Sequence, residues 1–140
     1  MQLKYDNEIS ISIGKSRKEL HWKNRDILWS LFLEKLSRTH WTAETLAEYM
    51  KADKSRQAEI KDIGGFVGGT LTSGRRKSDS VASRSLVTLD IDFADVCFWD
   101  NFTLYYDNAA AVYSTHKHSP EKPRLRLILP LDRPVTPDEY

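Results

Sequence analysis

The sequence is poor in cysteine, proline and glycine, with one, five and six of them among 140 residues. The single Cys97 cannot form a disulfide within the chain, and no basic-then-apolar leader opens the sequence. Both facts favour a reducing compartment, the cytoplasm, with Cys97 as a small core residue. No apolar run approaches the roughly 18 residues that span a bilayer, so we expect no membrane partner.

Neither sign of charge dominates, because the net charge is +1. Residues 1–85 nevertheless carry 16 Lys and Arg against 11 Asp and Glu, a net charge of +5, and residues 86–140 carry 5 against 9, a net charge of −4. Two basic clusters stand out, Lys15, Arg17 and Lys18, and Arg75, Arg76 and Lys77. Such clusters are commonly solvated faces. Beside an acidic metal site they would suit a polyanionic substrate.

Two aspartates end an apolar run that predicts a buried strand over residues 85–92. Side chains two positions apart in a strand share one face, so Asp90 and Asp92 point the same way. Two carboxylates this close repel each other unless a cation neutralises them, which indicates a divalent metal site. The alternative is a solvated turn, because aspartate is common where strands end.

The remaining pattern predicts an α/β (α+β) domain over residues 1–140, with ligands beyond the strand ends. Further strands are expected over 9–13, 66–71, 109–114 and 124–130, and helices over 25–38, from 41 through Met50, and over 95–106. Asn24 and Asp95 are the expected caps of two of these helices. Around 64–69, glycines would let another backbone or a nucleotide approach. Residues 72–83 should form a mobile basic loop that folds back over the site.

Polar side chains gather at the predicted strand ends. Ser114 and His116 follow one strand, and both suit phosphate oxygens, although His116 is equally compatible with a solvated loop. Arg124 and Arg126 share one face of the next strand. Thr136-Pro137-Asp138-Glu139 has the pattern of a capping box and predicts a helix start where the sequence stops, so we expect a fragment of a longer protein.

Leu89-Asp90-Ile91-Asp92, followed by Ser114-Thr115-His116, resembles the first two motifs of the archaeo-eukaryotic primase superfamily, which includes the primase-polymerases of phages and plasmids. The runs KDIGGFVGGTLTSGRRKSDSVASRSLVTLDID and YSTHKHSPEKPRLRLILPLDRPVTPDEY look like the N-terminal primase-polymerase domain of phage replication proteins of the virulence-associated E family. A helicase domain often follows in that family. The resemblance covers most of the chain.

The resemblance implies a C-terminally truncated primase-polymerase core with an RRM-like β-sheet flanked by helices. Asp90 and Asp92 would hold Mg²⁺ or Mn²⁺, and His116, with Ser114, would contact the phosphates of an incoming NTP or dNTP on a single-stranded DNA template. From charge and placement we add two groups of residues that would contact phosphates or the template. One is Arg124 or Arg126, and the other is Arg75, Arg76 and Lys77.

The third motif of the family, a further metal-binding aspartate, has no match before Tyr140, because Asp132 comes too soon, in an expected turn. Activity of these residues by themselves therefore stays open, and a non-catalytic module that binds nucleic acid or nucleotide is the main alternative. A rolling-circle nuclease needs an apolar residue where Lys117 separates two histidines. A D-x-D glycosyltransferase offers no role for the strand before His116.

Overall fold

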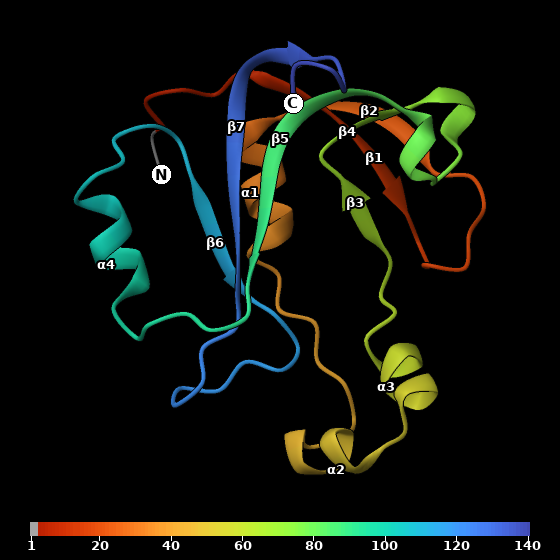
Figure 1. Ribbon diagram of the computed structural model, residues 1–140, viewed down its shortest axis with the longest axis vertical. Coiled ribbons are helices and arrows are strands. Elements are labelled where there is room, and N and C mark those ends of the chain that lie inside the picture. The colour runs from red at the N-terminus through yellow and green to blue at the C-terminus, as the bar shows by residue number, and fades with distance from the viewer. Residues whose placement is uncertain (1–2) are drawn as a thin grey trace.

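Two antiparallel sheets and four α-helices make up residues 3–140, which a computed structural model describes (Figure 1). One sheet has the order β2-β1-β3, with β1 Glu8–Gly14, β2 Lys23–Leu28 and β3 Gly65–Val67. The other has the order β4-β5-β7-β6, with β4 Gly69–Leu71, β5 Val81–Ile91, β6 Ala111–Ser114 and β7 Leu125–Val135. The helices are α1 Trp29–Leu36, α2 Leu46–Lys51, α3 Lys54–Ile60 and α4 Phe98–Thr103, and short 3-10 turns cover Thr72–Gly74 and Ser78–Ser80. The α+β prediction is confirmed.

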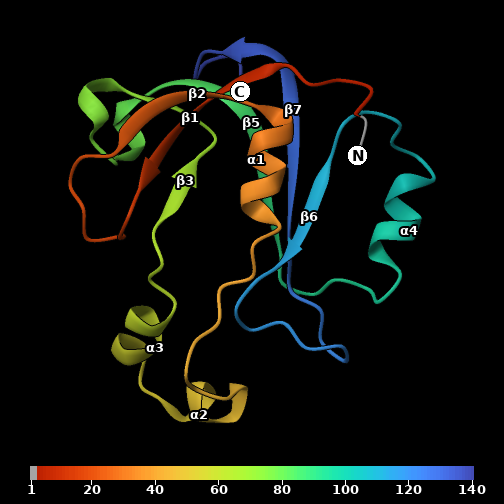
Figure 2. The same ribbon diagram turned by 180° about the vertical axis from the view of Figure 1, so that it is seen from behind.

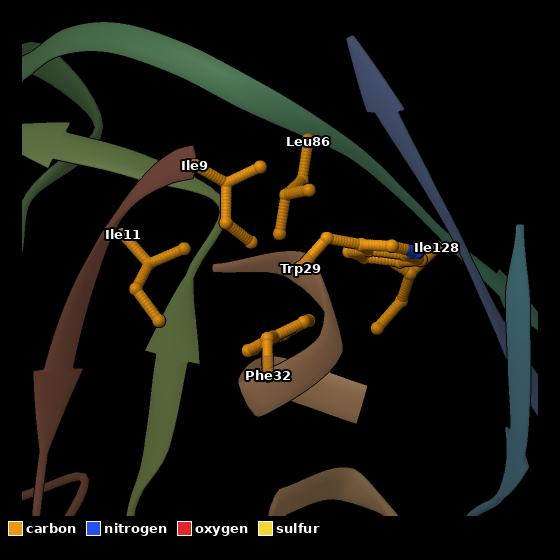
Figure 3. Close-up of a cluster of buried hydrophobic side chains, with 6 residues drawn as sticks. All are labelled: Ile9, Ile11, Trp29, Phe32, Leu86 and Ile128. Carbon is orange, nitrogen blue, oxygen red and sulfur yellow. The ribbon is translucent and has the colours of Figure 1, made fainter. Parts of the chain in front are cut away.

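The core lies where α1 meets strands of both sheets. Its buried side chains are Ile9, Ile11, Trp29, Phe32, Leu86 and Ile128 (Figure 3). Burying each such side chain stabilises the fold by about 1.5–3 kcal/mol. Leu86 and Ile128 lie on β5 and β7, a few residues before Asp90 and after Arg126. The core therefore fixes the two strands that carry the predicted site.

The chain before α1 is a strand, although a helix from residue 25 was predicted. Residues 23–28 pair with β1, so that Ile27 lies opposite Ile9, and this pairing outweighs the helical spacing of the apolar residues. Asn24 caps no helix, because its amide exchanges hydrogen bonds with the backbone of Leu71 at 2.9 and 3.0 Å. The first turn of α1 is capped by Asp6, whose carboxylate accepts two hydrogen bonds from Ser30, both 2.6 Å. These bonds lower the pKa of Asp6.

The predicted strand over 66–71 is two strands in different sheets, with Gly68 between them. A Cβ atom on Gly68 would lie 2.8 Å from the Cβ atom of Leu86, and one on Gly69 would collide with the carbonyl oxygen of Ser83. The expectation that these glycines admit a neighbouring backbone is confirmed, and the neighbour is β5.

Several predicted boundaries were wrong. The second helix begins at Leu46, where Thr45 and Glu48 form a capping box. The helix expected over 95–106 covers only 98–103, and Asp95 accepts a hydrogen bond from the Cys97 backbone instead of capping the first turn. Cys97 immediately precedes this short helix and is exposed, so the prediction that it is a core residue was wrong. Residues 136–139 form a turn, in which the Glu139 carboxylate accepts hydrogen bonds from Thr136.

The strand arrangement brings three chain segments to one end of the second sheet. Strands β5 and β6 both pair antiparallel with β7, which lies between them, so β5 and β6 run in the same direction. With α4 as the connection, they form a split β-α-β unit, as expected of an RRM-like sheet. The ends of β5 and β6 and the start of β7 therefore lie together in both views (Figures 1 and 2). Within residues 3–140 no helix is long and apolar enough to cross a membrane.

Candidate functional site

A row of polar side chains crosses three strands near this end of the sheet. Asp90 on β5 lies opposite Arg126 on β7, and Arg126 lies opposite Tyr113 on β6. Arg126 donates from Nε to Asp90 Oδ1 at 2.6 Å and from Nη1 to the Tyr113 hydroxyl at 3.3 Å. Burial by itself would lower the pKa of the Arg126 guanidinium, but the interactions with Asp90 and Tyr113 raise it above its usual value. Arg126 is therefore a permanent cation between a carboxylate and a phenol.

A second ion pair repeats the first two residues further along. Arg124 donates from Nη1 to Asp92 Oδ1 at 2.9 Å. The side chains of Asp90 and Asp92 are both 61% exposed, whereas those of Arg126 and Arg124 are 35% and 32% exposed. Exposed ion pairs of this kind stabilise a protein by about 0–1 kcal/mol each. Each carboxylate is thus neutralised by a contact that a competing ligand can open at little cost.

His116 lies at the same end of the sheet, in the loop after β6, and its ring packs against α2. Its ring meets the ring of Tyr49 edge-on, with centroids 4.3 Å apart. Tyr49 is buried, and its hydroxyl has no hydrogen-bond partner among the described residues. Burial raises the pKa of this phenol. Nearby, His118 Nδ1 accepts a hydrogen bond from the Arg124 backbone at 3.3 Å, which ties the loop between β6 and β7 to the start of β7.

Ser114 is the last residue of β6 and is exposed. It pairs with Leu125, one position away from the Tyr113 and Arg126 pair. Strand alternation therefore places the Ser114 side chain on the opposite face of the sheet from Asp90 and Arg126. The structure brings the aspartates and arginines into contact, and it leaves Ser114 apart from them.

The predicted basic loop does not fold back over the carboxylates. It precedes β5, whereas Asp90 lies near the end of that strand, and eleven residues span about 33 Å when extended. Both views show the loop at the other end of the sheet (Figures 1 and 2). There Arg76 donates a backbone hydrogen bond to the Leu20 carbonyl and places its guanidinium 4.7 Å from the ring centroid of Trp22.

These contacts bring together the two chain segments that carry the predicted basic clusters. His21 and Arg75 form a β-bridge, so the end of the turn after β1 lies beside the loop before β5. We call the exposed basic residues of the turn and the loop the basic patch: Lys15, Arg17, Lys18, Arg75, Arg76 and Lys77. Within it, Lys18 lies 4.0 Å from Glu59, and the Arg17 backbone donates a hydrogen bond to Asp62. Both clusters were predicted, but the approach of the two segments depends on a long-range contact that no local pattern reports.

Asp90 and Asp92 are the carboxylates that could hold a divalent metal ion. Residues 3–140 contain no group of three or more His, Cys, Asp or Glu placed to hold an ion. Magnesium, however, is commonly held by one or two carboxylates, with water and substrate phosphates completing the coordination. Asp90 and Asp92 fit that smaller set, provided that Arg126 and Arg124 release them. Asp132 cannot join them, because it lies on β7 beside a cavity of about 390 Å³ lined by Tyr5 and Trp29.

Two neighbours of the site were missed from the sequence. Tyr113 bonds to Arg126, and this contact follows only from the register of β6 against β7. Tyr49 looked like an ordinary apolar residue of a helix, and nothing local signals its contact with His116.

Comparisons with curated proteins and with solved structures find no match for this chain. A family model described as the VapE N-terminal domain matches residues 1–140. The match confirms the resemblance to the virulence-associated E family and suggests a replication-associated protein. The chain belongs to the family of VapE N-terminal domains.

Proposed function

We propose that this chain is a primase-polymerase domain that transfers nucleotides from NTP or dNTP to a primer on single-stranded DNA, with Mg²⁺ or Mn²⁺. One observation carries the proposal: Asp90 near the end of β5 and Asp92 just after it are paired with Arg126 on β7 and with Arg124 just before that strand, all at one end of the sheet. In the full-length protein we expect a helicase domain to act on the same template.

The two ion pairs match the two components of a metal-bound triphosphate. The cation would replace a guanidinium at each carboxylate, and the released arginines would turn to phosphate oxygens, which guanidinium groups bind in a bidentate manner. Opening both pairs costs about 2 kcal/mol at most, since exposed pairs contribute up to about 1 kcal/mol each. Charge-assisted hydrogen bonds contribute about 1.5–3 kcal/mol each, so the exchange is favourable.

The remaining residues would position the substrate. Metal ions held by Asp90 and Asp92 would neutralise the triphosphate and activate the 3′-hydroxyl of the primer. Arg124 and Arg126 would hold the phosphates in line. His116, in the loop after β6, would add a contact to the phosphates after turning away from Tyr49. Ser114 would contribute only if the end of β6 rearranged.

A second function has its own supporting observation. The basic patch is formed by two chain segments and lies at the other end of β5 from the carboxylates. Phosphate contacts from Lys and Arg are sufficient for sequence-independent binding of nucleic acid. A non-catalytic binding module would use this patch and would leave the carboxylates idle.

Substitution of both carboxylates separates the two functions. The variant carrying Asp90→Ala and Asp92→Ala should lose Mn²⁺-dependent binding of a fluorescent nucleotide and should keep its affinity for single-stranded DNA. The matched control carries Asp100→Ala and Asp107→Ala, two exposed aspartates outside the site, and should bind nucleotide as the unchanged protein does. Circular dichroism would confirm that both variants are folded. Unchanged nucleotide binding by the first variant would refute the primase-polymerase proposal.

A further inference from the structure

Phe93 is an aromatic side chain left in solvent beside the candidate site. It follows Asp92 directly, in the turn after β5, and it is 91% exposed. Burying a phenylalanine side chain is worth about 1.5–3 kcal/mol, and Phe93 gains almost none of this. Its contribution to the stability of the fold is therefore small, and its position calls for another explanation.

The ring lies next to a residue of the proposed phosphate site. The guanidinium carbon of Arg124 is 5.8 Å from the ring centroid of Phe93, while the same guanidinium donates a hydrogen bond to Asp92. Arg124 thus contacts the second carboxylate and the aromatic ring together. A phosphate held by Arg124 would therefore lie on the same side of the site as the ring of Phe93.

The backbone that carries Phe93 is held on both sides. Ile91, two residues before it, pairs with Leu125 on β7. Ala94, the next residue, donates a backbone hydrogen bond to the carbonyl of Pro123 at 3.2 Å. These contacts fix the backbone position from which the ring projects, which lowers the entropy lost by the turn when a ligand binds.

We propose that Phe93 is the surface on which the base of the incoming nucleotide stacks. The inference rests on the proposed function, because the phosphates must first be held by Arg124 and the carboxylates. A planar base over an aromatic ring contributes about 1–3 kcal/mol, and it does so for any base, since every base has a π-face. The ring therefore supplies affinity for nucleosides over bare phosphates, with purines favoured over pyrimidines by their larger area.

The test compares ATP with tripolyphosphate, which has the phosphates but no base. Both are titrated in Mn²⁺ against the whole chain and against the Phe93→Ala variant. We expect Phe93→Ala to weaken ATP binding by about 5–150-fold, which corresponds to the stacking range, and to leave tripolyphosphate binding unchanged. Phe93→Tyr, which keeps an aromatic ring, should restore ATP binding.

The matched control is Tyr105→Ala, because Tyr105 is also 91% exposed and lies beyond the end of α4. It should change neither affinity. Equal weakening of ATP and tripolyphosphate by Phe93→Ala would overturn the proposal, since the effect would then act through Arg124. Loss of single-stranded DNA binding with ATP binding intact would also overturn it and would assign the ring to the template.

Failure of this inference can be told from failure of the proposed function. If ATP binding depends on Asp90 and Asp92 but ignores Phe93, the stacking proposal alone is refuted. If the unchanged protein binds neither ATP nor tripolyphosphate with Mn²⁺, both proposals are refuted.

Discussion

Arg126 holds Asp90 in the place where we propose that a metal ion binds, so Arg126→Ala should move two affinities in opposite directions. Removal of the guanidinium frees the carboxylate for a cation. The same change removes a donor that we assign to the nucleotide phosphates. Most damaging substitutions lower every affinity together, and this opposition of signs is what makes the variant informative.

The magnitudes follow from the contact itself. The Arg126 Nε to Asp90 Oδ1 distance is 2.6 Å, and the Asp90 side chain is 61% exposed. An ion pair with that exposure is worth about 0.2–1 kcal/mol, so Mn²⁺ should bind the free protein about 1.4–5-fold more tightly. Charge-assisted hydrogen bonds to phosphate are worth about 1.5–3 kcal/mol, so nucleotide should bind about 10–150-fold more weakly.

Free Mn²⁺ is measured by electron paramagnetic resonance during titration, and nucleotide binding by fluorescence. Arg133→Ala is the control, because Arg133 lies on the same strand, is exposed and is also in an ion pair. It should change neither affinity. Arg126→Lys keeps the charge and should leave Mn²⁺ binding close to that of the unchanged protein. A fall in Mn²⁺ affinity in Arg126→Ala, with the fold intact, would refute the exchange of arginine for metal.

Three further predictions concern stability and titration. Tyr49→Phe removes a buried hydroxyl without a partner and should raise the free energy of unfolding in urea by up to about 1 kcal/mol, whereas Tyr49→Ala should lower it by about 3–5 kcal/mol. Gly69→Ala should lower that free energy by at least about 1–3 kcal/mol, because a Cβ atom there collides with the backbone of β5; Gly65→Ala is the control, since its Cβ atom would meet an ordinary contact at 3.6 Å, and an equal loss in both would contradict the argument. Hydrogen bonds from Arg133 and Thr136 lower the pKa of Glu139 from 4.5 to about 2. This depressed pKa stabilises the folded chain fully above about pH 4.5, and the contribution is lost as the pH falls through about 2. In a carbon-detected NMR titration Arg133→Ala should bring the midpoint of Glu139 back toward 4.5, and an unmoved midpoint would refute this cause.

The parts of the fold that follow local rules were predictable. The apolar run before Asp90 predicts β5, and alternation puts Asp90 and Asp92 on one face. The same rule puts Arg124 and Arg126 together. Their pairing with the aspartates was not predictable, because it depends on the register between strands separated by more than thirty residues. One residue of slip would have turned the arginines to the other face.

Other predictions failed where tertiary contacts outweigh local pattern. Residues 23–28 have the spacing of a helix start, but pairing with β1 makes them a strand. The loop with Arg75 was expected at the carboxylates because both lie near β5 in sequence. The eleven-residue strand β5 separates them and holds them about 33 Å apart. Alternation along β5 does not extend to Phe93, because the strand ends at Ile91 and the ring lies in solvent.

Gly68 leaves little room for the two sheets to move relative to each other. A single residue joins β3 in one sheet to β4 in the other, and it packs directly on Leu86 of β5, so no loop lies there to absorb relative movement. The basic patch at one end of β5 and the carboxylates near the other therefore keep a set spacing of up to about 33 Å along the strand. A ligand shorter than this spacing can therefore contact only one of the two ends at a time.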